Sequence, residues 1–420
     1  MLANLTTPLL GIVGTAAIGR LGEAHLLGGI AMSALVFDGL FWLFAFLRMG
    51  TVALTAQALG AGDAVEQRAV PMRALLIAAV VGLLLLALQI PIAAAVYGLL
   101  GGSDAVRAAA EGYFFVRIWS APCALANFAV VGWLIGIARA GTALALQIVI
   151  NVVNMAMTVL LVLVLGYGIV GAAIAAVTAE ASGLAIGLGI AWLIAGRRFE
   201  TGRAIVLQRD KIVHMLGINR DIMIRTAAAI AAFAFFTAQG ARAGDVALAA
   251  NAVLYNFILI GSFFLDGMAS AAEQLCGRSV GARNGAAFAQ ATRRVLAWGF
   301  LFGLAATVIF ALGGTLLIDA ITTSPDVRAA ARQFMLLAAL APALGVLAYT
   351  FDGIYIGATW ARDMRNLMVI ALAIYFVAWW ALRPYGNAGL WIALLVFLAS
   401  RGLLQAARYP ALARATFRAT

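Results

Sequence analysis

Residues 70–99 read VPMRALLIAAVVGLLLLALQIPIAAAVYGL, thirty residues in which Arg73 is the only charged side chain. A helix of about 20 apolar residues crosses the hydrocarbon core of a bilayer, and its backbone hydrogen bonds are made within the helix. This stretch therefore predicts a transmembrane helix and not an element of a water-soluble domain.

The rest of the 420-residue chain has the same character, with 65% hydrophobic and 11% charged residues and a mean hydropathy of +1.04. A soluble protein is about a quarter charged. The composition excludes most soluble enzymes, nucleic-acid-binding modules and secreted disulfide scaffolds. The net charge of +11 comes mainly from arginines between apolar stretches, so we expect a lipid bilayer and no nucleic acid as a partner.

Gly, Pro and charged residues divide the chain into twelve apolar segments, which predict an all-α membrane protein with twelve transmembrane helices. The predicted spans are residues 2–19, 26–50, 70–99, 113–137, 142–165, 168–195, 218–240, 246–275, 293–318, 334–358, 366–383 and 387–408. The first span begins at Leu2 without a polar lead-in, as expected of a helix that lacks its first residues.

The two halves of the chain match each other at a single shift of 221 residues. The matched pairs are Gly19 with Gly240, Gly60-Ala61 with Gly281-Ala282, residues 106–110 with 327–331, and Gly132 and Gly136 with Gly353 and Gly357. An even number of helices in each half makes the repeat parallel, and two pseudo-symmetric six-helix bundles are an architecture of secondary transporters. The predicted parts are an N-terminal lobe (1–195), a basic cytoplasmic linker (196–217) and a C-terminal lobe with a short tail (218–420).

The distribution of basic residues predicts the orientation. With the N-terminus inside, nineteen Lys and Arg lie in inner loops, helix ends and the tail, and seven lie outside, so both termini are expected in the cytoplasm. This assignment places Arg225 on the inner side and Arg117 on the outer side. Arg401 is expected to reach the cytoplasmic interface from near the end of its helix.

Five acidic residues fall well inside predicted spans: Asp38, Glu180, Asp266, Glu273 and Asp352. A charged group in hydrocarbon costs about 2.5–3.5 kcal/mol on insertion scales, so each one needs a partner, water or a function. We interpret all five as candidates for coupling transport to a proton or cation. Alternatives remain for three of them: Glu273 could pair with Arg278, Glu180 could be an interhelical hydrogen-bonding group, and the depth of Asp38 could be misjudged.

Amide and phenol side chains form a second set of candidates, for lining a substrate cavity. Gln147, Asn151 and Asn154 share one face of a predicted helix, and Asn251 and Tyr255 lie near the start of another. Helix–helix hydrogen bonding is the alternative for all of them. The sequence has no clustered metal ligands, phosphate-binding loop or nucleophile motif, so we expect neither an enzyme nor a cofactor.

The chain resembles the multidrug and toxin extrusion (MATE) transporters, in particular their DinF-like bacterial branch. The resemblance rests on Leu10-Gly11-Ile12-Val13, residues 15–19, Leu47-Arg48-Met49, Thr55-Ala56-Gln57, Gly132-Trp133-Leu134, residues 151–154 and 219–223, Leu265-Asp266-Gly267, residues 352–359 and Met364-Arg365-Asn366. It implies twelve helices in two lobes in the bacterial inner membrane. It also implies export of amphipathic, often cationic compounds in exchange for protons or sodium ions.

Two positions depart from the family pattern. The family has an acidic residue in the first helix where this chain has Gly14, and often a second one in the fifth helix where this chain has Thr158. Coupling would then rest on Asp266 and Asp352, or on Asp38 as a substitute, or it would be weak or lost.

We therefore expect a monomeric secondary antiporter for small molecules, driven by protons more than by sodium. The alternatives are sodium-coupled efflux, a flippase for lipid-linked saccharides, which would need a cationic cavity, and an intramembrane enzyme or channel.

Overall fold

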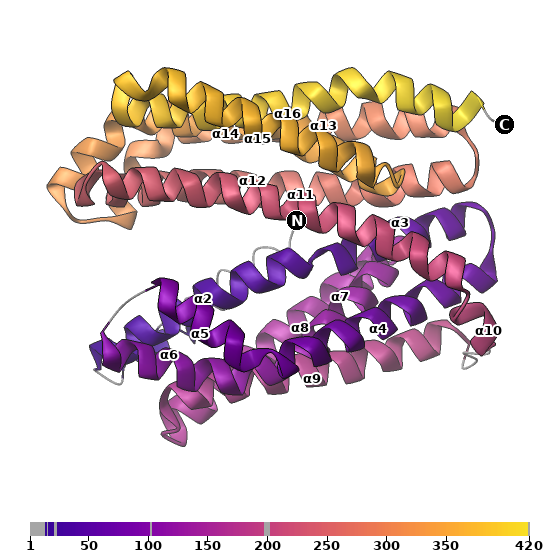
Figure 1. Ribbon diagram of the computed structural model, residues 1–420, viewed down its shortest axis with the longest axis horizontal. Coiled ribbons are helices and arrows are strands. Elements are labelled where there is room, and N and C mark those ends of the chain that lie inside the picture. The colour runs from indigo at the N-terminus through magenta and orange to yellow at the C-terminus, as the bar shows by residue number, and fades with distance from the viewer. Residues whose placement is uncertain (1–12, 15, 21–22, 101–102, 197–201, 419–420) are drawn as a thin grey trace. The chain divides into compact units, whose positions relative to one another are not determined.

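The structure is a computed structural model that describes residues 13–14, 16–20, 23–100, 103–196 and 202–418. These residues form helices and no strands, which confirms the predicted all-α class (Figure 1). Most of the first predicted span, the motif of residues 10–12 and residues 197–201 of the predicted linker lie outside the described residues.

The first half of the chain contains these helices: α2 (Ala24–Phe44), α3 (Phe46–Gly60), α4 (Ala64–Ala87), α5 (Gln89–Leu100), α6 (Asp104–Arg117), η1 (Ile118–Ser120), α7 (Ala121–Gly136), α8 (Ala140–Thr158), η2 (Val159–Val164) and α9 (Gly168–Ile194). The short α10 (Arg203–Val206) follows. The second half contains α11 (Arg209–Arg242), α12 (Asp245–Gly281), α13 (Gly285–Ile321), α14 (Pro325–Gly357), α15 (Ala361–Leu382), η3 (Arg383–Tyr385) and α16 (Gly386–Arg418).

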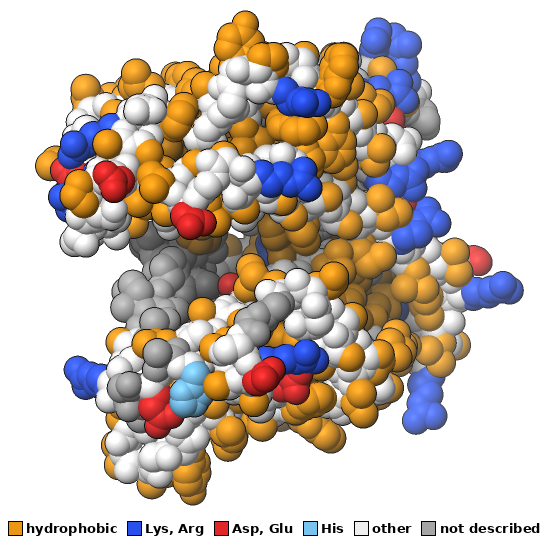
Figure 2. Space-filling model, turned by 60° about the vertical axis from the view of Figure 1, so that its left-hand side comes forward, with side chains coloured by type: hydrophobic (Ala, Val, Ile, Leu, Met, Phe, Trp, Pro, Cys, Tyr) orange, Lys and Arg blue, Asp and Glu red, His pale blue; other side chains and the backbone are white. Residues whose placement is uncertain are grey.

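Ten segments of the described chain are long and apolar enough to cross a membrane, and the last of them, Ala361–Arg418, contains both α15 and α16. Large hydrophobic side chains are exposed along these helices, Leu83 by 61% and Leu312 by 81%. Figure 2 shows such side chains over the outer surface of the molecule. Exposed apolar surface of this extent is expected where lipid, and not water, is the surrounding medium.

Several predicted boundaries were wrong. The span predicted at 113–137 is the end of a longer helical run, because α6 begins at Asp104, capped by Ser103. The predicted linker is partly helical, since α11 already begins at Arg209. Hydropathy marks the part of a helix that lies in hydrocarbon, but backbone hydrogen bonding continues until a cap or turn ends it.

The described residues form two compact units (Figure 1). Those up to Thr55 and Asp63–Met215 make up the N-terminal unit. Ala56–Gly62 and the residues from Leu216 onward make up the C-terminal unit. Two continuous helices, α3 and α11, therefore each contribute residues to both units.

The 221-residue repeat is visible in the turns that end corresponding helices. Gly62 and Arg283 both have positive φ, at 69° and 51°, and Ala138 and Thr359 have φ of 63° and 57°. Each pair is separated by the shift found in the sequence. The left-handed conformation is a common way to end a helix, and here it recurs at equivalent sites even without glycine. The predicted parallel repeat is thus confirmed in the backbone.

The repeated glycines mark close helix crossings inside each unit. A Cβ at Gly132 of α7 would overlap the carbonyl oxygen of Arg48 in α3, and a Cβ at Gly353 of α14 would overlap the carbonyl oxygen of Ala269 in α12. Both residues of the first crossing match those of the second at the 221 shift. Small residues allow such an approach of two backbones.

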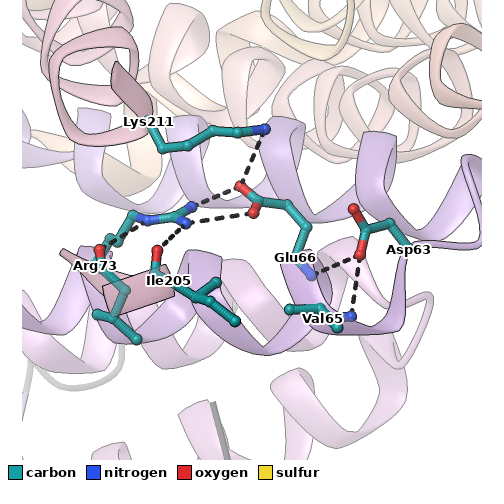
Figure 3. Close-up of polar contacts among 7 residues, drawn as sticks. Asp63, Val65, Glu66, Arg73, Ile205 and Lys211 are labelled. Carbon is teal, nitrogen blue, oxygen red and sulfur yellow. Dashed lines mark hydrogen bonds and ion pairs between the residues drawn. The ribbon is translucent and has the colours of Figure 1, made fainter. Parts of the chain in front are cut away.

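The linker is fixed to the N-terminal unit by Arg73 of α4, whose side chain is 2% exposed. Its guanidinium donates hydrogen bonds to the backbone oxygens of Ile205 (2.8 Å) and Val206 (3.0 Å) in α10, and to the carboxylate of Glu66 (2.6 Å). Nζ of Lys211, in the first turn of α11, lies 3.9 Å from Glu66. Figure 3 shows α10 and the start of α11 held on α4 by this group.

Candidate functional site

Arg117 is the last residue of α6 and lies inside the N-terminal unit. One Nη atom donates a hydrogen bond to the hydroxyl of Tyr113 (2.5 Å), one turn earlier. Its guanidinium carbon lies 4.7 Å from the ring centroid of Phe37, 5.6 Å from that of Tyr113 and 6.0 Å from that of Phe41. Aromatic faces carry partial negative charge, so three rings stabilise this cation.

Two carboxylates from other helices interact electrostatically with Arg117: Asp38 of α2 and Glu180 of α9. Asp38 is exposed and Glu180 is half-buried. The carboxylate of Glu180 accepts a 2.7 Å hydrogen bond from Nδ2 of Asn127 in α7, which also donates to the Glu180 carbonyl at 2.9 Å. Four helices thus assemble what we call the Arg117 cluster: Arg117, Asp38, Glu180, Asn127 and the rings of Phe37, Phe41 and Tyr113.

The Arg117 cluster combines predicted and unpredicted residues. Asp38 and Glu180 were predicted as coupling acids, and the interhelical hydrogen bond considered for Glu180 is also present. Arg117 was wrongly assigned to the outer side, because the start of its helix at Asp104 was not recognised. Fully ionised, the cluster holds two acids and one base and has a charge of −1. It can therefore take up one further positive charge.

Asp352 of α14 is the centre of a second buried group, in the C-terminal unit. Its carboxylate forms ion pairs with Arg225 of α11 and Arg401 of α16. It also accepts a 2.7 Å hydrogen bond from Gln405 of α16. Asp352 and Arg401 are each 3% exposed and Arg225 is 8% exposed. This Asp352 cluster has one acid and two bases, hence a charge of +1 when ionised.

The placement of both arginines corrects the sequence-based orientation. Arg225 was counted with the inner helix ends and Arg401 was expected to reach the interface, but both side chains point into the unit. A guanidinium inside a membrane protein needs a carboxylate partner, and Asp352 supplies one for both. No sequence signal joins these residues, which are 127 and 49 positions away from Asp352.

The other two predicted acids lie on α12. Asp266 is exposed and interacts electrostatically with Tyr349, whose ring centroid lies 5.3 Å from the guanidinium carbon of Arg401. The hydroxyl groups of Tyr349 and Ser262 are 2.6 Å apart. Glu273 is 1% exposed, and its backbone carbonyl lies where Gly357 of α14 packs against α12. Asp266 is thus near the Asp352 cluster, whereas Glu273 is at a helix crossing.

The predicted cavity residues on α8 are bonded along their own helix. Nε2 of Gln147 donates to Oδ1 of Asn151 (3.3 Å), and the hydroxyl of Thr158 donates to Oδ1 of Asn154 (3.2 Å). Thr158 occupies the position at which the family often has an acid, and it is 3% exposed. This helix therefore carries a polar stripe without a carboxylate.

Asn251 of α12 is a helix–helix contact. Its amide exchanges two hydrogen bonds with the amide of Asn387 in α16, at 2.8 and 2.9 Å, and it accepts a third from the indole of Trp391 at 2.9 Å. Tyr255, one turn later, packs its ring edge-on against Phe233, with centroids 5.6 Å apart. The amide of Asn251 is 3% exposed, so the structure favours helix–helix packing for it.

Comparisons with known proteins agree with this architecture. A family model described as MatE matches residues 1–160 and 205–380. The chain is 37% identical over 406 residues to the DNA damage-inducible protein F of Escherichia coli, covering 96% of this chain and 88% of that protein. It is 27% identical over 420 residues to a probable multidrug resistance protein NorM of Rhizobium meliloti, covering 92% and 86%. A crystal structure of MATE in the straight conformation superposes with a TM-score of 0.90 at 18% identity, covering 100% of this chain and 95% of the other.

Proposed function

The chain belongs to the MatE family of multi-pass membrane transporters, and on that premise we propose that it is a secondary active antiporter that exports small amphipathic, often cationic compounds in exchange for protons. It would act in the bacterial inner membrane with both termini in the cytoplasm. Small molecules and the bilayer would be its partners, and no cofactor beyond the coupling ion is needed.

The observation that carries this proposal is the charge of the Arg117 cluster. Asp38 and Glu180 face a single base, Arg117, so one negative charge is left over. A proton can neutralise it, and so can the cationic group of a substrate. Because either ligand removes the charge that attracts the other, their binding is mutually exclusive, and this competition is the thermodynamic basis of exchange.

Asp352 has a different role in this proposal. It already interacts with two guanidinium groups, so a proton on its carboxylate would raise the charge of the Asp352 cluster from +1 to +2 inside the membrane. We therefore assign Asp352 to holding α11, α14 and α16 together. The coupling acids are then Asp38 and Glu180, with Asp38 replacing the family acid that is missing at Gly14.

Transport into proteoliposomes tests the proposal. A pH gradient and a sodium gradient are imposed one at a time, and accumulation of a labelled lipophilic cation is followed. We expect accumulation with the pH gradient, loss of it in Asp38→Asn and in Glu180→Gln, and retention in Glu111→Gln, an exposed acid of α6. Accumulation driven by sodium alone would overturn the choice of proton.

A second candidate function is a flippase for lipid-linked saccharides, and the positive charge of the Asp352 cluster favours it. Two buried arginines could attract a pyrophosphate group. In the same proteoliposomes this candidate requires movement of a lipid pyrophosphate that cationic compounds do not inhibit. Inhibition by cations would leave the antiporter as the better explanation.

A further inference from the structure

The position of Arg117 within its cluster suggests a role beyond neutralising an acid. Its guanidinium lies against the faces of Phe37, Tyr113 and Phe41 and interacts with two carboxylates. Aromatic faces combined with carboxylates are what a protein offers to a lipophilic cation. The environment of Arg117 is therefore the environment that a cationic substrate would need.

We propose that Arg117 is an internal cation that competes with cationic substrates for these aromatic faces and carboxylates, and so sets the specificity of the N-terminal unit. The inference rests on the proposed function, because it assumes that cations are substrates. In the resting protein the guanidinium occupies the aromatic faces. A substrate binds when its own cation displaces Arg117 from the rings.

The geometry allows this exchange. Asp38 is exposed, and Phe41, Glu180 and Arg117 are partly exposed, so the carboxylates and one ring can be reached from the surface of the unit. The only hydrogen bond seen for the guanidinium goes to Tyr113, a neutral partner on the same helix. By contrast, Arg401 in the Asp352 cluster is 3% exposed and forms a direct ion pair. Of these two arginines, Arg117 is the one that a ligand can replace.

Equilibrium binding to the purified full-length protein tests the inference without any gradient. The probe is tetraphenylphosphonium, and tetraphenylborate is the anion of matched shape. Removing the internal competitor in Arg117→Gln should tighten phosphonium binding by about five- to tenfold and should not tighten borate binding. Arg107→Gln, which removes an exposed arginine paired with Glu111 on the same helix, should leave both affinities unchanged.

A gain of affinity is informative, because a merely damaged protein would lose it. Unchanged or weaker phosphonium binding by folded Arg117→Gln would overturn the inference. If this variant does not fold, Phe41→Leu decides the question: it should weaken phosphonium binding about threefold by removing one ring face, and unchanged binding would overturn the inference. Failure of proton coupling in proteoliposomes with a gain of affinity in Arg117→Gln would count against the proposed function alone.

Discussion

Arg401 in α16 and Glu180 in α9 occupy equivalent positions of the repeat, 221 residues apart, and carry opposite charges. Each contacts the fourth span of its own unit: Glu180 accepts a hydrogen bond from Asn127 of α7, and Arg401 pairs with Asp352 of α14. The repeat has therefore kept the helix contact and reversed its polarity. This difference leaves the N-terminal unit with the surplus negative charge and the C-terminal unit with the surplus positive charge.

The first prediction concerns Asp352. Asp352→Asn leaves Arg225 and Arg401 buried without their carboxylate, so it should destabilise the protein by about 3–5 kcal/mol. Thermal unfolding in detergent, followed by size-exclusion chromatography, measures this. Adding Arg401→Met should recover part of the loss because one uncompensated charge is removed. An Asp352→Asn protein as stable as the parent would show that the ion pairs contribute nothing.

The second prediction concerns Asn251. Asn251→Leu removes the partner of Asn387 and of the Trp391 indole, and a buried unsatisfied polar group costs about 1–3 kcal/mol. The melting temperature should fall, and the double variant with Asn387→Leu should lose less than the sum of the two single changes. The range of transported compounds should not change. A changed range with unaltered stability would instead place Asn251 in the substrate cavity.

The third prediction concerns the glycine crossings. Gly132→Ala and Gly353→Ala each put a Cβ into a backbone carbonyl oxygen, and relief of such overlap costs about 1–3 kcal/mol. Gly112→Ala on α6 is the matched control: no atom lies within 4 Å of its added Cβ, so it should gain stability through helix propensity. Equal melting temperatures for all three variants would contradict the close packing.

The fourth prediction concerns the linker. Arg73→Gln removes the hydrogen bonds to the backbone oxygens of Ile205 and Val206 (Figure 3). Hydrogen exchange of the α10 amides should accelerate and trypsin should cut faster at Arg203. Arg68→Gln on the same helix lies outside this group and should change neither rate. Unchanged protection of α10 in Arg73→Gln would mean that the linker is held by other contacts.

The sequence predicted the spans and the repeat because both depend on local properties. Apolar length identifies a membrane helix wherever it lies, and the 221 shift survives in glycines that a close crossing requires, such as Gly132 and Gly353. Helix ends were less predictable, because a cap such as Ser103 can start a helix well before its apolar part.

The candidate site was predictable only in its acids. Asp38, Glu180 and Asp352 stand out as charges within apolar segments, but their partners are set by packing between distant helices. Arg117 and Arg225 had the appearance of loop residues, because each lies where an apolar stretch begins. The opposite surplus charges of the two units therefore became visible only in the structure.

Proton release on substrate binding tests the central claim most directly. In weakly buffered detergent solution, a pH indicator reports protons displaced when tetraphenylphosphonium binds to the purified protein. The exchange of one positive charge for another at the Arg117 cluster predicts release of about one proton per bound cation when the cluster is protonated beforehand. The double variant Asp38→Asn, Glu180→Gln should release none. Cation binding without any proton release by the parent protein, or undiminished release by the double variant, would contradict the claim.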